Sequence, residues 1–274
     1  MKRYCFLILL AVLTACLPQG KRQLQAIVTS AANAASSPSS SRTAANDDAL
    51  LTVQVTRGTL PQQLLRREGY ICNYNNDTRI PNYCAWVLTR SHVAGKEKRS
   101  GIEFQPDMDV PEPRADTYDY SRSGYDRGHI CPAGDNKWSH TAMEQSFLLS
   151  NICPQAPELN RGDWNEIEQA CREWARRYGK IYIIAGPIFL NQRHRRIGKH
   201  KVAVPEAFFK VVLCLEGQPK AIGFICRNTD GNRKKDAYVN TLAQVERITG
   251  YRFFPTLPAK MRQAIETTAD LSDW

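Results

Sequence analysis

The distribution of apolar residues predicts an α+β fold in which a central, mostly antiparallel sheet is flanked by helices. Two β-rich runs, 207–215 and 220–226, stand on either side of a turn at 216–219, which is typical of an antiparallel hairpin. Short apolar runs at 84–90 and 180–187 predict two further strands. Because strands and helices do not alternate regularly along the chain, α+β is favoured over a doubly wound α/β fold.

Apolar residues at helical spacing predict three helices, at 164–177, 237–249 and 259–268. The second is followed by Gly250, and glycine commonly ends helices because it adopts left-handed backbone conformations without strain. All of these elements lie within 50–274, which we expect to be the folded domain.

The first of these helices carries polar residues in a regular pattern. Trp164, Glu168 and Arg172 follow at four-residue intervals and therefore share one helical face. Asn160 stands where the helix is expected to begin. Taken alone, the segment is fully explained as an amphipathic helix with Asn160 as its N-cap and an exposed Glu168–Arg172 pair.

The first residues have the composition of an export signal. The basic pair Lys2 and Arg3 precedes an apolar run, 4–13, that is too short to span a bilayer as a mature helix. The run ends in Leu-Thr-Ala-Cys at 13–16, which resembles a bacterial lipobox, with cleavage before Cys16 and lipid attached to its thiol. An ordinary secretory signal is the alternative, because small residues also precede Cys16.

The sequence thus predicts a signal peptide at 1–15 and a lipidated Cys16 followed by a flexible tether that ends at residue 49. The tether is rich in Ala, Ser, Gln and Asn and has little to bury. We expect an exported protein, a periplasmic or outer-membrane lipoprotein of a bacterium that is held on the membrane by the lipid on Cys16.

The charge balance is basic. The chain of 274 residues has 37 Lys and Arg against 27 Asp and Glu, a formal net charge of +10. A basic protein attracts polyanions such as nucleic acids. Solubility alone explains the same excess equally well.

Seven cysteines follow Cys16, and export makes disulfides plausible. Cys214 and Cys226 flank the predicted turn, so they could face each other across the hairpin. The odd number leaves at least one thiol free. No CxxC pair suggests a zinc site; the seven are Cys72, Cys84, Cys131, Cys153, Cys171, Cys214 and Cys226.

The segment Tyr-Asp-Arg-Gly-His at 125–129 places a potential general base two residues from a permanent cation. On an extended stretch His129 and Arg127 point the same way, and Gly128 between them allows a substrate backbone to approach. This suits phosphodiester hydrolysis, which needs water to be deprotonated and negative charge to be stabilised. By itself, such a cluster is more often structural.

Two later segments favour a catalytic role for this cluster over a structural one. Leu-Ser-Asn-Ile-Cys-Pro-Gln follows at 149–155, and Leu-Asn-Arg-Gly-Asp-Trp at 159–164 is followed four residues later by Glu168. This ordered set resembles the DNA/RNA non-specific endonucleases, with further similarity at 204–212 and 250–255. The resemblance covers roughly 65–260 and implies a ββα-metal (His-Me finger) active site that cuts DNA and RNA with little sequence preference.

The resemblance also implies roles for individual residues. His129 corresponds to the general base that deprotonates water. Asn160 corresponds to the direct ligand of one divalent ion, Mg²⁺, for which Mn²⁺ can substitute. Glu168 corresponds to an acidic residue that orients metal-bound water. Eight residues separate Asn160 from Glu168, about 12 Å along an ideal helix, which supports this indirect role.

Four more residues match positions in the family. Arg127 and Arg172 correspond to arginines that contact phosphate, and Arg99 to another such arginine with looser spacing. Asn151 corresponds to an active-site amide that positions the network. Asp126 is expected to brace the motif by hydrogen bonds rather than to take part in chemistry.

Some features have no counterpart in the resemblance. Cys131 and Cys153 lie close behind the site motifs, where a disulfide and buried free thiols are both open. The basic run 193–201 is either a nucleic-acid contact or a solvated loop. The other histidines are interpreted as surface or structural residues: His92, His140, His194 and His200.

DNA and RNA are the expected substrates, and no protein partner is expected. One alternative is an inactive, nucleic-acid-binding lipoprotein of the same fold. The presence of Arg127, His129, Asn160 and Glu168 together argues against it, since binding alone does not require all four. A zinc enzyme is the other alternative, and it lacks His or Cys residues at a recognised ligand spacing.

Overall fold

The computed structural model describes residues 46–229 and 231–274, and the compact unit runs from Ala49 to Trp274. The predicted signal peptide, Cys16 and the tether up to residue 45 lie outside the described residues, whereas 46–49, the end of the predicted tether, are helical together with Leu50. Among the residues described, none of the helices is both long and apolar enough to span a bilayer.

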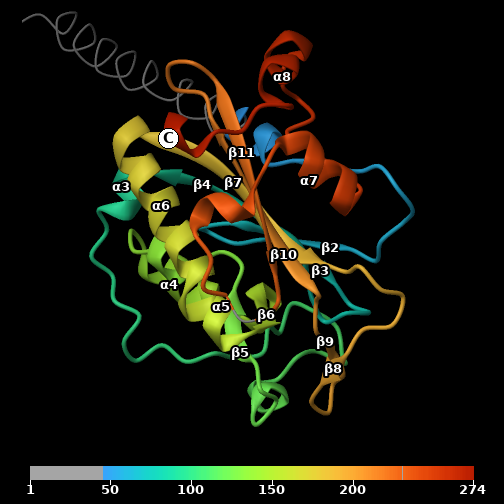
Figure 1. Cartoon of the computed structure of the whole chain (residues 1–274). Coiled ribbons are helices and arrows are strands. Elements are labelled where there is room, and N and C mark those ends of the chain that lie inside the picture. The colour runs from blue at the N-terminus through green and yellow to red at the C-terminus, as the bar shows by residue number, and fades with distance from the viewer. Residues whose placement is uncertain (1–45, 230) are drawn as a thin grey trace, which may run out of the picture. The chain divides into compact units, whose positions relative to one another are not determined.

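A seven-stranded sheet forms the centre of the fold, and each pair of neighbouring strands is antiparallel (Figure 1). This confirms the predicted fold class. In order across the sheet, the strands are β12 (Val239–Asn240), β11 (Lys220–Arg227), β10 (Ala207–Cys214), β7 (Lys180–Ile188), β4 (Ile80–Thr89), β3 (Ile71–Asn75) and β2 (Gln63–Arg66).

Three small antiparallel ribbons accompany the sheet. They pair β1 (Val53–Val55) with β13 (Tyr251–Phe253), β5 (Asp126–His129) with β6 (Ile152–Gln155), and β8 (Arg196–Ile197) with β9 (Val202–Ala203).

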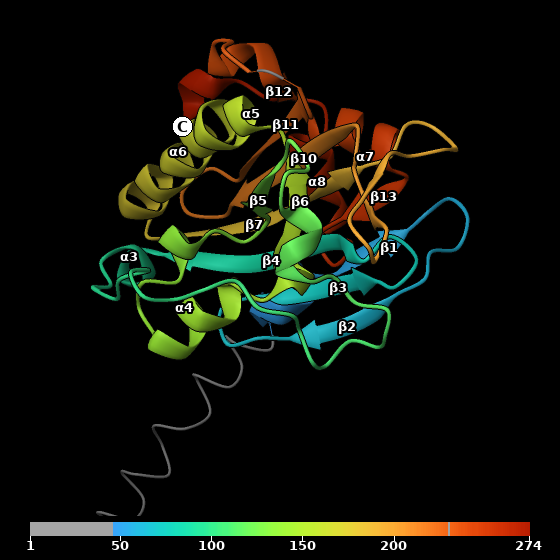
Figure 2. The ribbon, with the colours of Figure 1, turned by 90° about the horizontal axis from the view of Figure 1, so that it is seen from below.

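The helices are distributed over both faces of the sheet (Figures 1 and 2). Besides the helical residues 46–50, the α-helices are α3 (Arg90–Val93), α4 (His140–Ser146), α5 (Pro157–Arg161), α6 (Asp163–Tyr178), α7 (Leu242–Thr249) and α8 (Ala259–Ile265). The 3₁₀ turns are η1 (Thr117–Tyr120), η2 (Ala133–Asp135), η3 (Leu149–Asn151), η4 (Lys235–Tyr238) and η5 (Leu271–Asp273).

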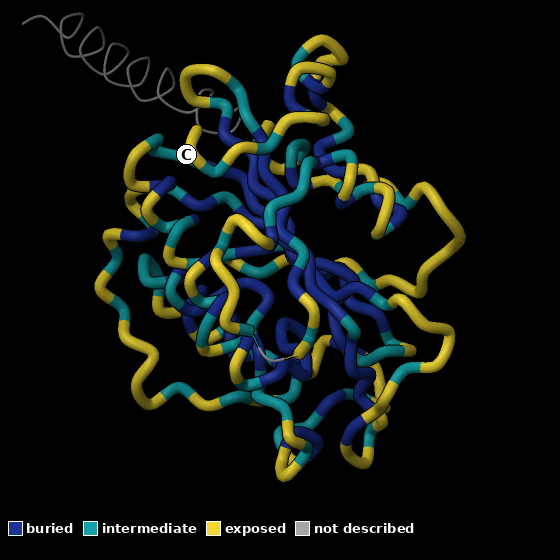
Figure 3. The backbone as a smooth tube through the Cα atoms, viewed as in Figure 1, coloured by how far each residue is buried: buried dark blue, intermediate teal, exposed yellow. Residues whose placement is uncertain are grey.

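The sheet is buried on both faces, as the dark core in Figure 3 shows. Strand β10 illustrates the cause, because alternate residues of a strand point to opposite faces. Phe208 and Val212 belong to the core shared with α6, whereas Phe209 and Leu213 belong to the core shared with α7 and α8. Lys210 has the parity of Phe208 and therefore points toward α6.

The hairpin of β10 and β11 confirms the predicted antiparallel pair, and β7 contains the strand predicted at 180–187. β4 contains 84–89 of the strand predicted at 84–90, whose last residue instead begins α3. The helix predicted at 237–249 is wrong in its first turn. It begins only at Leu242, because Thr241 and Gln244 form a capping box there. The last predicted helix ends at Ile265 rather than at 268.

The helix predicted at 164–177 is confirmed as α6, but its expected start at Asn160 is wrong. Asn160 is not an N-cap, because it lies inside the short helix α5. At Gly162 the backbone leaves the helical region, with φ −101° and ψ −107°, and α6 starts anew at Asp163. Asn160 and Glu168 therefore do not lie on one continuous helix, and the ideal-helix distance between them does not apply.

All seven described cysteines are buried and free. The expected meeting of Cys214 and Cys226 is wrong, because the hairpin register places Cys214 opposite Lys220 and Cys226 opposite Phe208. Cys72 and Cys84 are the two that stand directly opposite each other, on β3 and β4.

Candidate active site

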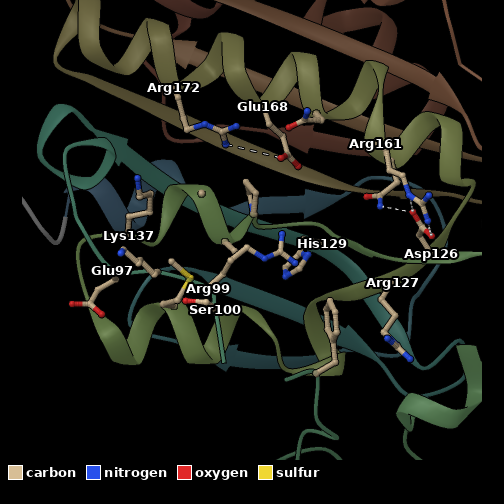
Figure 4. A pocket seen from close by; sticks show the side chains of 18 residues that line it. Glu97, Arg99, Ser100, Asp126, Arg127, His129, Lys137, Arg161, Glu168 and Arg172 are labelled. Atoms are coloured by element: carbon tan, nitrogen blue, oxygen red, sulfur yellow. Dashed lines mark hydrogen bonds and ion pairs between the residues drawn. The ribbon is translucent and has the colours of Figure 1, made fainter. Parts of the chain in front are cut away.

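A pocket of about 750 Å³ opens between β5, the α5–α6 corner and the loop 97–100 (Figure 4). Six of the seven predicted site residues line it, although they come from segments that are far apart in the sequence. These six are Arg99, Arg127, His129, Asn160, Glu168 and Arg172. The seventh, Asn151, lies behind the pocket wall and is fully buried.

Strand β5 presents Arg127 and His129 to the pocket, as the two-residue spacing predicts. The role expected for Gly128 is wrong. Gly128 is buried and faces the side chain of Gln155, and a Cβ on it would lie 2.2 Å from Gln155 Oε1. The glycine is required for packing within the ribbon rather than for access of substrate.

His129 has the environment of an uncharged base. Its ring packs 5.2 Å from the ring of Phe104 and 4.9 Å from that of Phe147, measured between centroids. Burial, with the nearby positive charge of Arg99, lowers the pKa of His129 to about 3. Nε2 has no hydrogen-bond partner among the described residues. The imidazole is thus neutral at physiological pH, with a ring nitrogen free to accept a proton.

Two arginines surround this base. The guanidinium of Arg99 lies 5.4 Å from the centroid of Phe147, and that of Arg127 lies 5.4 Å from Phe104. Arg127 Nη2 also donates to the carbonyl of Thr117 at 3.4 Å. Neither arginine forms an ion pair with a carboxylate in the part of the chain that the structure describes, so both remain available to an anionic substrate.

Asp126 fixes the amide of Asn160. Asn160 Nδ2 donates to Asp126 Oδ2 at 2.9 Å, and Arg161 donates to both oxygens of the same carboxylate at 2.8 and 2.7 Å. Burial tends to raise the pKa of Asp126, but the hydrogen bonds from Arg161 and Asn160 outweigh it and hold that pKa low. Since the NH₂ group of Asn160 is engaged, its carbonyl oxygen is the atom left for a cation, in agreement with the bracing role expected for Asp126.

Glu168 and Arg172 extend from α6 toward His129 on the opposite wall, as Figure 4 shows. Glu168 lies 4.0 Å from Arg172 and 4.0 Å from Lys210 Nζ, which reaches it from β10. Arg172 also pairs with the buried Asp135 at 3.0 Å. The four side chains form a charge cluster beneath the pocket, with two cations and two carboxylates.

The cluster determines the proton affinity of Glu168. Burial raises its pKa to about 7, with Asp135 also raising it and Lys210 and Arg172 lowering it. Burial likewise raises the pKa of Asp135, although Arg172 opposes the shift. Glu168 is therefore divided between its two protonation states near neutral pH.

Asn151 is a positioning residue. Its Oδ1 accepts from the amide of Cys131 at 2.9 Å, and its Nδ2 donates to the carbonyls of Cys131 and Ser146 at 2.9 and 2.8 Å. These bonds fix the backbone directly after His129. The role predicted for Asn151, to position the network, fits this geometry, but its side chain does not touch the pocket.

The donor atoms in the pocket suit a hard cation. Among them are the carbonyl oxygen of Asn160 and the carboxylate of Glu168, and oxygen ligands are those that Mg²⁺ prefers. By contrast, no group of three His, Cys, Asp or Glu side chains in 46–229 or 231–274 is arranged to hold a metal. The ligand set of the zinc alternative is thus missing from the described residues.

Two residues of the charge cluster were missed at the level of sequence. Lys210 is a lysine inside the apolar run Phe-Phe-Lys-Val-Val, and Asp135 ends the segment that begins at Tyr125. A charged residue in an otherwise apolar strand was the available signal for Lys210. The four other histidines have structural partners. His92 stacks on Trp138, and His140 lies beside Glu97 and Glu144. His194 pairs with Glu206, and His200 pairs with Asp119.

The candidate base His129 lies on strand β5 of the β5–β6 ribbon, and the Asn160 amide lies on helix α5, which follows that ribbon. A two-stranded ribbon followed by a helix is the arrangement of the ββα-metal fold. The sequence pattern of the DNA/RNA non-specific endonucleases matches residues 48–260. The chain belongs to this family.

Individual relatives agree with this assignment. Human mitochondrial endonuclease G is 33% identical over 212 residues, 72% of this chain and 71% of its own length. A nuclease from Nostoc sp. is 31% identical over 228 residues, 78% of this chain and 81% of its own. Mitochondrial nuclease EXOG from Xenopus laevis is 36% identical over 200 residues, 67% of this chain, but the match spans only 56% of that relative.

A solved structure, that of EndoG in complex with EndoGI, is similar to this chain with a TM-score of 0.69 and 27% identity. The match covers 74% of this chain and 89% of that one. It supports the ββα-metal architecture assigned above.

Proposed function

We propose that the chain is an endonuclease that hydrolyses phosphodiester bonds of DNA and RNA in a metal-dependent reaction. The observation that carries the proposal is the neutral, unpartnered Nε2 of His129 in a pocket rich in arginine. A neutral base beside unpaired cations suits an anionic substrate that is attacked by water.

In this reaction His129 Nε2 accepts a proton from the attacking water, and its low pKa keeps it unprotonated beforehand. Arg99 and Arg127 bind the oxygens of the phosphate and stabilise the negative charge that develops on them. Asn151 holds the chain after His129 so that the ring keeps its place between Phe104 and Phe147.

Asn160 and Glu168 are the residues that would hold Mg²⁺, for which Mn²⁺ would substitute, Asn160 directly and Glu168 through water. When bound, such an ion neutralises charge on the phosphate and on the leaving oxygen. Asp126 orients the Asn160 oxygen, and Arg172 with Lys210 keeps part of Glu168 ionised. Contacts directed to phosphates carry no base information, which accounts for cleavage with little sequence preference.

The test is degradation of plasmid DNA and of RNA by the purified chain, with Mg²⁺ or with EDTA, alongside His129→Ala. We expect degradation of both substrates that requires the metal and His129. Binding without cleavage in every condition would instead favour the inactive nucleic-acid-binding alternative. Neither binding nor cleavage would refute both.

We also propose export and lipid attachment at Cys16, supported by the basic residues, apolar run and lipobox-like 13–16. The lipid would hold the enzyme on a bacterial membrane by two or more acyl chains. Labelled palmitate should enter the native chain and not Cys16→Ala. Equal labelling of the two, or none of the native chain, would contradict this proposal without affecting the nuclease assignment.

A further inference from the structure

Exposed cations continue beyond the pocket on the segment before the β8–β9 ribbon. The guanidinium of Arg195 lies 5.1 Å from the centroid of the Tyr125 ring, and its Nη2 donates to the carbonyl of Ser123 at 3.4 Å. Tyr125 directly precedes strand β5 with its Arg127 and His129. Arg195 and its neighbour Arg193 are both exposed. Positive charge is thus placed next to the strand that carries the base.

This segment is held in place rather than left as a solvated loop. His200 Nδ1 lies 2.8 Å from Asp119 Oδ2, and its amide donates to Asp119 Oδ1 at 3.0 Å. Arg196 donates to the carbonyls of Asp77 and Lys201. Asp119 belongs to η1, the same turn whose Thr117 carbonyl accepts a bond from Arg127. Turn η1 therefore holds both the basic segment, through Asp119, and the side chain of Arg127, through Thr117.

A second basic segment, Arg233 and Lys234, lies against the start of α6. Asn228, five residues before Arg233, donates from its side chain to the carbonyls of Pro154 and Pro205 and accepts from the amide of Ala156, which ties this part of the chain to β6 and to the segment after β9. The amide of Arg233 donates to Asp163 Oδ2 at 3.2 Å, at the start of α6. Arg233 and Lys234 are exposed.

Arg161 stands between these segments. It is 72% exposed, pairs with Asp126 beside Tyr125, and is two residues from Asp163. Contacts and chain neighbours together lead from Arg195 through Tyr125 and the adjacent Asp126 to Arg161, and then through the nearby Asp163 to Arg233. We propose that this line of cations, the basic strip, binds successive backbone phosphates of a nucleic-acid chain beside the bond that is cut; its members are Arg161, Arg193, Arg195, Arg233 and Lys234.

The charge state of the strip fits this partner. Apart from Arg161, its members form no ion pair with any carboxylate of the described residues. Duplex DNA carries about one negative charge per 1.7 Å of its axis, so a chain that enters the pocket brings further phosphates onto the adjoining surface. This inference rests on the proposed function, and it adds a binding surface that begins at Arg161 in the pocket wall and continues outside the pocket.

The test compares two fourfold variants of the full chain. The strip variant carries Arg193→Gln, Arg195→Gln, Arg233→Gln and Lys234→Gln. The control variant loses the same charge from four exposed cations on the α7–α8 side of the sheet, by Arg57→Gln, Arg247→Gln, Arg252→Gln and Lys260→Gln. Binding of a labelled 30-base-pair duplex and of a 30-nucleotide RNA is measured by anisotropy in EDTA, over a range of salt concentrations.

We expect the strip variant to bind both probes at least tenfold more weakly than the control in 0.1 M salt. Each lost phosphate contact lowers the slope of log K against log salt by about 0.9 for duplex DNA, so the slope should fall by about 3 to 4. With Mg²⁺, the ratio of kcat/KM for the duplex to kcat/KM for a tetranucleotide should fall at least fivefold in the strip variant only.

Equal affinities and slopes for the two variants would overturn the strip. The proposal would also be overturned if the strip variant kept its affinity for both probes but lost binding to phosphatidylserine vesicles. That result would show that the strip binds an anionic membrane rather than nucleic acid. Failure of the native chain to cleave any probe with Mg²⁺ would instead count against the proposed function, because the binding arm contains no metal and does not depend on cleavage.

Discussion

Lys210 offers a quantitative test of the charge cluster beneath the pocket. Its Nζ is buried, 4.0 Å from Glu168 Oε1 and 4.4 Å from the centroid of the Trp164 ring. At an effective dielectric constant of 20, two unit charges at this distance attract by about 4 kcal/mol. The substitution Lys210→Met keeps a similar side-chain length, removes this attraction, and leaves the cluster with one uncompensated negative charge.

The loss should depend on pH. The folded-state pKa of Glu168, about 7, lies above its ordinary value, so the folded chain binds more protons and its stability falls as pH rises from 4.5 to 7. Lys210→Met removes a cation that lowers this pKa, which extends the fall above pH 7. We expect a loss of about 3 kcal/mol in the free energy of unfolding at pH 9, and less than about 1 kcal/mol at pH 5, where Glu168 is protonated.

Urea unfolding without metal at pH 5 and pH 9 measures both values. Lys260→Met, an exposed lysine on α8, is the control for removal of a charge. Adding Glu168→Gln to Lys210→Met should restore most of the stability at pH 9, because no unpaired carboxylate remains at that position. An equal loss at both pH values, or no recovery in the double variant, would show that Lys210 contributes through packing and would refute the electrostatic explanation.

Three further substitutions test the site. His129→Gln should lower kcat for plasmid cleavage by a factor of about 10² to 10⁴ while the duplex Kd in EDTA changes less than threefold, and cleavage close to the native rate would exclude His129 as the base. Asp126→Asn should weaken binding of Mn²⁺, followed by calorimetry, by about 10- to 100-fold, because the Asn160 amide loses the carboxylate that orients it, and an unchanged affinity would contradict this. Gly128→Ala should cost about 1 to 3 kcal/mol in urea unfolding through overlap with Gln155, and a fully stable variant would show that the ribbon accommodates a Cβ.

The parts of the fold that were predictable depend on local sequence. The strands at 84–90, 180–187, 207–215 and 220–226 each bury a run of apolar residues, so their pattern alone indicated them. The break at Gly162 was not predictable, because helical spacing continues on both sides of it. The start of α7 was displaced for a related reason, since the capping box at Thr241 outweighs the apolar spacing before it.

In the site, too, some features were predictable from local sequence and others depend on tertiary packing. Arg127 and His129 were predictable as a pair, because a strand orients residues two apart in one direction. The bond between Asn160 and Asp126 joins residues 34 apart in the sequence, and the contact of Lys210 with Glu168 joins a strand to a helix. Such contacts follow from tertiary packing and are absent from local pattern. They nevertheless determine the orientation of the proposed metal ligand and the protonation of Glu168.

The buried cysteines allow local opening of the protein to be measured by the rate at which their thiols are labelled. Because all seven described thiols are shielded in the native fold, a thiol reagent reacts only when the surrounding segment opens. Cys131 follows His129 by two residues, and its amide donates to Asn151 Oδ1 at 2.9 Å behind the pocket wall, whereas Cys226 lies in the sheet on β11. The labelling rates of these two thiols therefore separate motion of the catalytic wall from motion of the sheet, without any label being engineered into the chain.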